Sequence, residues 1–276
     1  MYRATGELTV RAPGKVNLYL AVGALDDDGY HEVRTVLQAV SLYDELTVSP
    51  AAAGTVTLTI QGEGAATLTG DESNLAVRAA RLLASEAGVD AGVRMTLHKA
   101  IPVAAGMAGG SADAAAALVA CDALWGTELH RSDLDALARR LGSDVPFSLT
   151  GGTALGTGRG DVLSPVLSRG TYHWVFAIAD GELSTPAVYA ELDRYRAELP
   201  RPALWSPSST LAALNKANPE ELASTLANDL QAPAIRLRPA LQRVLDLNEL
   251  VKHALETLGR NTDAGVSDGE PHRASI

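Results

Sequence analysis

The segment that most constrains the fold is IPVAAGMAGGSA, residues 101–112. It follows a strand-like stretch at 93–98 and leads into an alanine-rich helical stretch at 112–125. Small residues let the backbone approach a ligand closely, and the first turn of a helix offers N–H groups that lack intrahelical acceptors. This combination suits a polyphosphate, with Ser111 either capping the helix or reaching a phosphate. A tight strand-to-helix turn without a ligand has the same composition and remains an alternative.

Two common nucleotide-binding motifs are missing from the sequence. There is no G-x-x-x-x-G-K-[ST] segment, and residues 101–112 lack the G-x-G-x-x-G spacing of dinucleotide-binding folds. A second glycine-rich stretch, 156–160, precedes no helical pattern, so a hairpin or a bulge is predicted there. Residues 101–112 are therefore the candidate for phosphate binding.

Charge and apolar patterning restrict the partners. The 276 residues include 33 Asp or Glu and 23 Lys or Arg, for a net charge of −10. This balance argues against nucleic acids and anionic membranes, whereas one nucleotide can still be held by backbone N–H groups and a few cations. No apolar run reaches the length of a membrane span and the N-terminus lacks a signal-peptide pattern, so a cytoplasmic protein is expected.

Periodicity predicts an α+β chain. Strand-like segments lie at 8–10, 16–22, 32–40, 44–48, 55–60 and 93–98. Helical segments follow Asn74, at 112–125 and at 132–141, the last with Ser132 as its N-cap. Cys121, the single cysteine, falls in the second of these helices and is expected to be a buried small hydrophobe.

The pattern changes near Thr150. Beyond it we predict a buried strand at 174–179, a helix from 186 to 195 and helical stretches over 208–256. The predicted domains are therefore 1–150 and 151–258. Residues 259–276 have little apolar content and no period, and they are predicted to be a disordered tail.

Two charged residues stand where charge is costly. Lys15 follows a Pro-Gly break inside an apolar strand, where a buried ammonium needs an anion beside it. Asp144 lies in an otherwise apolar turn after a helix end, as a general base for a hydroxyl would. Taken singly, both have an ordinary explanation: a lysine that reaches water at a strand end, and a residue of a helix-ending turn.

Aromatic residues suggest a site for a planar base. Tyr30 and His31 are adjacent, and Tyr189 lies in the distant segment STPAVY. Tyrosines can stack on a base and histidine can bond to its edge, although packing in a core would use the same residues. The histidines show no metal-binding spacing, and no G-x-S-x-G elbow supports a serine hydrolase.

Five motifs together resemble those of the GHMP kinases, the family of galactokinase, homoserine kinase and mevalonate kinase. In chain order they are PGKVNLYLAV at 13–22, DGYHEVRTV at 28–36, PVAAGMAGGSADAAA at 102–116, LGSDVPF at 141–147 and STPAVY at 184–189. Their order and spacing are far more specific than any one of them. The resemblance implies a two-domain α+β fold, with an N-terminal domain like domain 2 of ribosomal protein S5 and an α/β C-terminal domain.

The resemblance also implies a role for each matching residue. Asp144 is the implied general base, Lys15 its cationic partner and Asn17 a residue that orients the substrate. The implied ATP contacts are Asn74, Lys99, Pro102, Gly106, Met107, Ala108, Gly109, Gly110 and Ser111. The implied cytosine pocket consists of Tyr30, His31 and Tyr189. No residue is assigned to a metal, because Mg²⁺ is expected to bridge phosphate oxygens of ATP.

Residues 29–31 and the STPAVY segment favour a cytidine-containing substrate. The implied reaction is ATP-dependent phosphorylation of the 2-hydroxyl of 4-diphosphocytidyl-2-C-methyl-D-erythritol, in the non-mevalonate isoprenoid pathway. Two alternatives stay open: another small-molecule kinase of the family, acting on homoserine or mevalonate, and a catalytically impaired nucleotide-binding relative.

The sequence departs from the family pattern in two places. Ala104 and Ala105 stand where the family often has glycines. Alanine can replace glycine at such a position if the backbone φ there is negative. After Val244 no third glycine-rich motif of the G-S-G-P-T type is found. This second departure favours the impaired relative, whereas the presence of Lys15 and Asp144 favours an active kinase.

Overall fold

The computed structural model describes residues 6–27, 29–179, 181, 183–198 and 206–246. The predicted tail at 259–276 and the helical stretch expected beyond residue 246 lie outside the described residues. Within the described part of the chain, no helix combines the length and the apolar character that crossing a membrane requires.

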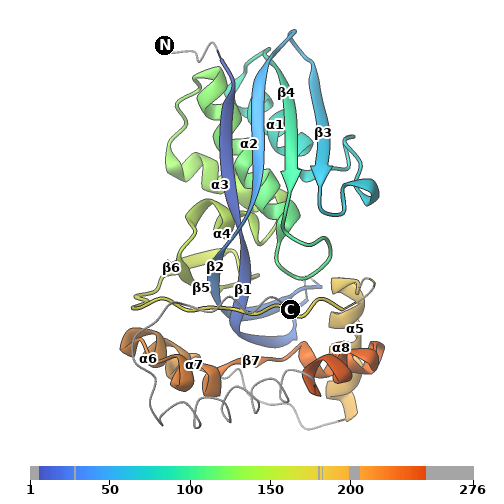
Figure 1. Cartoon of the computed structure of the whole chain (residues 1–276), viewed down its shortest axis with the longest axis vertical. Helices are drawn as coiled ribbons and strands as arrows, with labels where there is room; N and C mark the ends of the chain where they lie inside the picture. Colours follow the sequence, from blue (N-terminus) through green and yellow to red (C-terminus); the bar gives the residue numbers. More distant parts are fainter. Residues whose placement is uncertain (1–5, 28, 180, 182, 199–205, 247–276) are drawn as a thin grey trace, which may run out of the picture.

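Among the described residues, a seven-stranded sheet forms the centre of the fold (Figure 1). Its strands are β1 (Leu8–Leu25), β2 (His31–Ala51), β3 (Val56–Gly62), β4 (Gly92–Lys99), β5 (Thr153–Thr157), β6 (Val162–Pro165) and β7 (Ala227–Asn228). The order is β3-β4-β2-β1-β7, with β5 also paired to β2 and then β6 to β5. The β3–β4 and β1–β7 pairs are parallel and the others are antiparallel.

Strands β1 and β2 each merge segments that the sequence predicts as separate strands. The Pro13-Gly14 break does not end β1, because a register shift between Pro13 and Lys15 absorbs it, and a second shift lies between Asn17 and Tyr19. Bulges of this kind bend a strand and re-aim its side chains without ending it. The two irregularities therefore flank Lys15 and Asn17.

The helices lie in two groups. They are α1 (Leu75–Ala87), α2 (Gly109–Trp125), α3 (Arg131–Leu141), α4 (Val145–Thr150), α5 (Thr185–Glu198), α6 (Ser208–Lys216), α7 (Pro219–Thr225) and α8 (Gln231–Leu237), with a short 3₁₀ helix, η1 (Ala65–Thr67). Helices α1 to α3 lie behind and beside the strands in the upper part of Figure 1, α4 lies near its middle, and α5 to α8 lie with β7 at its lower end. The mixed α+β class predicted from the sequence is confirmed.

Helix α2 is the centre of the main core. Its alanines let it lie close to α1 and the sheet, and most of its residues are buried. Cys121 is buried among them, as predicted, and burial raises the pKa of its thiol to about 12. A thiol held neutral in this way is a packing residue and not a nucleophile.

Two local predictions are wrong. Residues 174–179 form no strand, and Val175 is 94% exposed. A short apolar run identifies a strand only where another strand pairs with it, and none does so among the described residues. Ser132 does not cap α3, because the helix begins one residue earlier, at Arg131, with His130 as its N-cap.

Of the two structures predicted at 156–160, a hairpin or a bulge, the structure has the hairpin, because β5 and β6 pair antiparallel around this turn. Strand β5 also pairs with β2. Residues 153–165 therefore extend the sheet of the first half, and the division into domains near Thr150 stays a prediction.

Candidate active site

Lys15 and Asp144, which are 129 positions apart in the sequence, lie together in the fold. The Lys15 ammonium is 3.8 Å from Asp144 Oδ2 and donates a hydrogen bond to Asn17 Oδ1 at 2.7 Å. The Lys15 side chain is 9% exposed, whereas that of Asp144 is 37% exposed. The buried lysine therefore has its anion, and the carboxylate remains open to a substrate on one side.

A short hydrogen-bond chain fixes the orientation of Asn17. Its Nδ2 donates to Thr35 Oγ1 at 2.8 Å, and the Thr35 hydroxyl donates to the carbonyl of Tyr19 at 2.8 Å. With Nδ2 held in this way, Oδ1 of Asn17 points to the Lys15 ammonium. Thr35 was not predicted from the sequence, because a threonine in a strand carries no distinguishing local signal.

The predicted phosphate loop is tied to the same strand. The Lys15 N–H donates to the carbonyl of Met107 at 3.1 Å, so the irregularity of β1 places its amide against the loop. Gly106 and Ala108 both have positive φ, 73° and 58°. The loop, Lys15 and Asp144 thus form one continuous region.

The first turn of α2 follows directly. Ala108 is the N-cap of the helix and makes no side-chain cap bond. Gly109, Gly110 and Ser111 are the first three helical residues, whose amides have no intrahelical acceptor. Ser111 is therefore not the cap, which excludes one of the two roles considered for it, and contact with a phosphate stays a prediction.

Ala104 has a φ of 57°, so the alanine is not at a position of negative φ. A Cβ in this left-handed region costs about 1–2 kcal/mol. We expect Ala104→Gly to raise the free energy of unfolding by about 1 kcal/mol, because relief of this strain outweighs the greater entropy of the unfolded chain. Urea denaturation measures this change in the free energy of unfolding. Ala105→Gly, at a neighbour without positive φ, should be neutral or destabilising; equal effects of both changes would contradict the explanation.

A hollow of about 290 Å³ lies beside the loop. The predicted nucleotide contacts that line it are Asn74, Lys99, Pro102, Gly109 and Gly110. The walls also include residues that were not predicted, among them Thr67, Leu75, Val103 and Asp113. Asn74 has a structural task as well, since its Oδ1 caps α1 by accepting from the N–H of Ala76 at 2.9 Å.

Lys99 is buried between two carboxylates that the sequence analysis missed. Its ammonium donates to Oδ2 of Asp44, and to Oδ2 of Asp113 at 2.8 Å. Burial, opposed by the Lys99 charge, raises the pKa of Asp113 to about 7. A signal is available in the sequence for Asp113, an acidic residue inside the alanine-rich run that opens the helix, whereas Asp44, next to Glu45 in a strand, carries none.

His31 and Tyr189, two of the residues predicted for the aromatic pocket, lie together in the structure. Their ring centroids are 5.4 Å apart, with planes at 33°. His31 Nδ1 lies 3.1 Å from the carbonyl of Gly23, and Nε2 lies 3.5 Å from Oδ2 of Asp193. Burial first, and then the negative charge of Asp144, raise the pKa of Tyr189.

Tyr30, the third residue predicted for the aromatic pocket, faces a different group. The guanidinium carbon of Arg159, from the β5–β6 turn, lies 3.5 Å from the centroid of the Tyr30 ring. An arginine over an aromatic face is a favourable cation–π contact. The structure thus brings His31 and Tyr189 together, and it places Tyr30 under Arg159.

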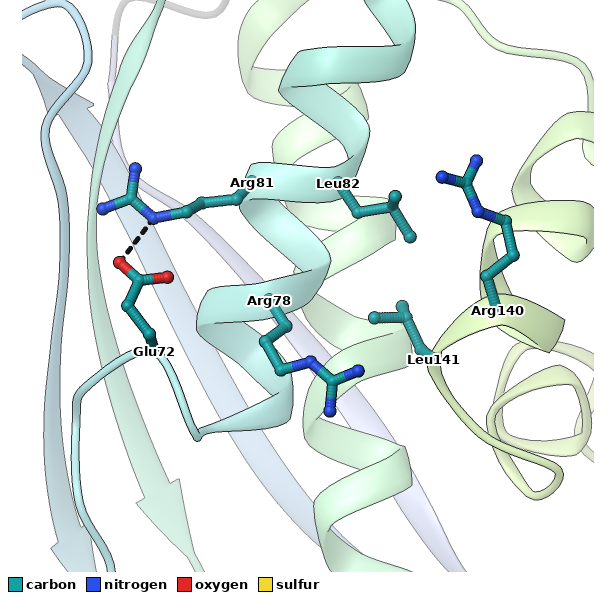
Figure 2. A pocket seen from close by; sticks show the side chains of 6 residues that line it. All are labelled: Glu72, Arg78, Arg81, Leu82, Arg140 and Leu141. Carbon is teal, nitrogen blue, oxygen red and sulfur yellow. Dashed lines mark hydrogen bonds and ion pairs between the residues drawn. The ribbon is translucent and has the colours of Figure 1, made fainter.

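A second hollow, of about 420 Å³, lies on the outside of α1 and α3. Figure 2 shows its arginines directed to separate places: Arg81 turns toward Glu72, away from Leu82. Arg140 pairs with Glu86 at 2.8 Å. Because these guanidinium groups do not converge on one point and two of them are paired with carboxylates, they do not form an anion-binding site in this hollow.

The sequence is similar to those of known kinases. The model of the GHMP kinase N-terminal domain matches residues 74–152, a stretch that includes the loop, the first turn of α2 and Asp144. A 4-diphosphocytidyl-2-C-methyl-D-erythritol kinase of Salinispora tropica is 57% identical over 248 residues, covering 89% of this chain and 78% of that protein. The chain belongs to the GHMP kinase family.

Solved structures of GHMP kinases share the fold. A crystal structure of 4-(cytidine 5'-diphospho)-2C-methyl-D-erythritol kinase superposes with a TM-score of 0.66 at 35% identity, covering 86% of this chain and 81% of that one. A homoserine kinase from Cytophaga hutchinsonii has a TM-score of 0.61 at 17% identity, over 86% of this chain and 76% of that one. The second likeness concerns the fold alone.

Proposed function

We propose that the protein transfers the γ-phosphoryl group of ATP to the 2-hydroxyl of 4-diphosphocytidyl-2-C-methyl-D-erythritol. The Lys15–Asp144 pair, 3.8 Å apart and joined to the loop by the Lys15 amide, carries the proposal. The choice of substrate rests on a relative at 57% identity that is named 4-diphosphocytidyl-2-C-methyl-D-erythritol kinase. We expect the enzyme to act in the cytoplasm on this small molecule, without a nucleic-acid or membrane partner.

In the proposed mechanism Asp144 accepts the proton of the attacking hydroxyl. The substrate oxygen forms a bond to the γ-phosphorus as the bond between that phosphorus and the β–γ bridging oxygen breaks, which releases ADP. Lys15 faces the Asp144 carboxylate before the reaction and balances the charge that moves to the phosphoryl oxygens. Asn17 holds the ammonium in place through its hydrogen bond. The transfer is direct, so no phosphorylated enzyme is formed.

Mg²⁺-ATP is the proposed phosphoryl donor. Amides of Gly109, Gly110 and Ser111 suit phosphate oxygens, because a helix N-terminus carries partial positive charge. Among the described residues, no group of three or more His, Cys, Asp or Glu side chains could hold a metal ion. Mg²⁺ would therefore be held mainly by the phosphate oxygens of the nucleotide, where it neutralises their charge.

Tyr189 is proposed to stack on the cytosine ring. We expect Tyr189→Ala to raise KM for the cytidyl substrate by about 5- to 150-fold, because stacking of a base on an aromatic side chain contributes about 1–3 kcal/mol. KM for ATP should change less than about twofold. Tyr195→Ala, on the same helix but against Arg236, is the matched control. A similar rise of both constants in Tyr189→Ala would contradict the stacking role.

The deciding experiment is ADP release by the purified chain with Mg²⁺-ATP. It is run in parallel with 4-diphosphocytidyl-2-C-methyl-D-erythritol, homoserine and mevalonate. Turnover with the cytidyl compound alone supports the proposal. Turnover with another substrate reassigns the enzyme within its family, and ATP binding without turnover identifies a catalytically impaired relative.

A further inference from the structure

The buried cluster of Lys99, Asp44 and Asp113 lies directly beneath the first turn of α2. A Cβ added to Gly109 would stand 3.0 Å from the Lys99 ammonium and 3.5 Å from Asp44 Oδ2. All three side chains are buried, and Lys99 and Asp113 line the hollow beside the loop. Any charge left over in this cluster is therefore felt at the turn whose amides face the proposed phosphates.

Asp44 accepts more hydrogen bonds than Asp113 does. Asp44 accepts from Lys99 through Oδ2, and through Oδ1 from the N–H groups of Ala100 and Ile101 at 2.7 and 2.9 Å. Asp113 accepts from Lys99 alone, and its buried Oδ1 has no hydrogen-bond partner among the described residues. Because fewer donors stabilise its ionised form, Asp113 is the member of the cluster that binds a proton.

The net charge of the cluster depends on whether Asp113 is protonated. With both carboxyls ionised, one ammonium leaves the cluster with a net charge of −1; with Asp113 protonated, the cluster is neutral. Lys99 from β4 and Asp44 from β2 are the charged groups that act on Asp113, while the faces of α1, α3 and α4 that pack around α2 are mainly apolar within the described residues. Burial raises the pKa of Asp113 to about 7, so its charge changes near neutral pH.

We propose that Asp113 is a positioning residue for the nucleotide, and that ATP binding draws one proton from solvent onto its carboxyl. The polyphosphate brings negative charge to the first turn of α2, directly above a cluster that is itself negative when Asp113 is ionised. Protonation removes that repulsion and leaves the charge of Lys99 balanced by Asp44. The proposal rests on the proposed nucleotide site, and the proton goes to Asp113 with no covalent change.

The sign of the pH dependence follows. Well below pH 7 Asp113 is already protonated in the free protein, so the affinity for nucleotide does not depend on this group there. Above pH 7 each binding event must take up a proton, and the affinity falls by up to about tenfold per pH unit. The fall ends where the pH reaches the higher pKa of Asp113 in the complex.

The test is calorimetric titration with Mg²⁺ and a non-hydrolysable ATP analogue at pH 6.5 and 8.5, in two buffers of different ionisation enthalpy. The wild type should bind about tenfold or more weakly at pH 8.5, with proton uptake. Asp113→Asn imitates the protonated carboxyl, because its Oδ1 can accept from Lys99 while its amide donates. The phosphates of the analogue titrate in the same way with both proteins. After this common contribution is subtracted, the variant should bind the analogue with the same affinity at both pH values.

Each outcome decides between claims. Affinity that is independent of pH in the wild type, or the same pH profile in Asp113→Asn, overturns the role of Asp113 and leaves the nucleotide site intact. Binding at neither pH overturns the nucleotide site itself. Asp113→Ser, which also lacks the ionisable group, replaces the asparagine variant if that variant does not fold.

Discussion

Asp144→Asn should lower kcat about a thousandfold while leaving the Kd of ATP nearly unchanged. A positioned general base typically contributes a factor of about 10²–10⁴, and the amide keeps the shape of the carboxylate without its basicity. ATP binding should persist because the proposed phosphate contacts come from the loop and the first turn of α2. Steady-state ADP release gives kcat, and calorimetric titration gives Kd.

The matched control is Asp135→Asn on α3. This carboxylate has a similar exposure, 34%, and also pairs with a cation, Arg139, at 2.9 Å. Because it lies outside the proposed site, we expect kcat to stay within about twofold of the wild type. A retained rate in Asp144→Asn would remove Asp144 from the chemistry, and an equal loss in the control would indicate general damage to the fold.

The sequence predicted this pair through motifs, and folding physics explains why the motifs meet. Pro-Gly in an apolar strand predicts an interruption, and the structure turns it into an irregularity that keeps Lys15 within β1. The apolar turn around Asp144 becomes the start of α4, whose Val145 and Phe147 are buried. Local patterns therefore singled out both residues without deciding their roles, which came from the family resemblance, and their separation of 3.8 Å depends on packing that no local pattern encodes.

The buried cluster shows where sequence reasoning stopped. The family resemblance implies that Lys99 contacts ATP, and in the structure its ammonium is engaged by Asp44, 55 positions away, and by Asp113, 14 positions away. Neither partner belongs to a spacing that predicts an ion pair, because pairing across a sheet and a helix depends on topology. The strand predicted at 174–179 was wrong for a similar reason, because its apolar run carried no information about a pairing partner.

Lys99→Met should destabilise the fold by about 3–5 kcal/mol. Removing one partner of a buried ion pair leaves an uncompensated charge, and here it leaves two carboxylates that face each other without a cation. Methionine retains much of the apolar stem, so the loss reports charge more than packing. Urea denaturation at pH 7 measures the change, and Lys216→Met provides the control, because that lysine is 60% exposed and its pair with Glu221 should contribute less than about 1 kcal/mol.

The pH dependence separates a charge effect from a packing effect. Burial raises the pKa of Asp113 above that of the unfolded chain, so the folded state binds more protons and loses stability as the pH rises toward 7. Without the Lys99 ammonium that pKa should rise further, and the loss in Lys99→Met should be larger at pH 8 than at pH 5. Adding Asp113→Asn should recover part of the stability, because one of the two opposed carboxylates is gone. A loss that is independent of pH and unchanged in the double variant would mean that Lys99 contributes by packing alone.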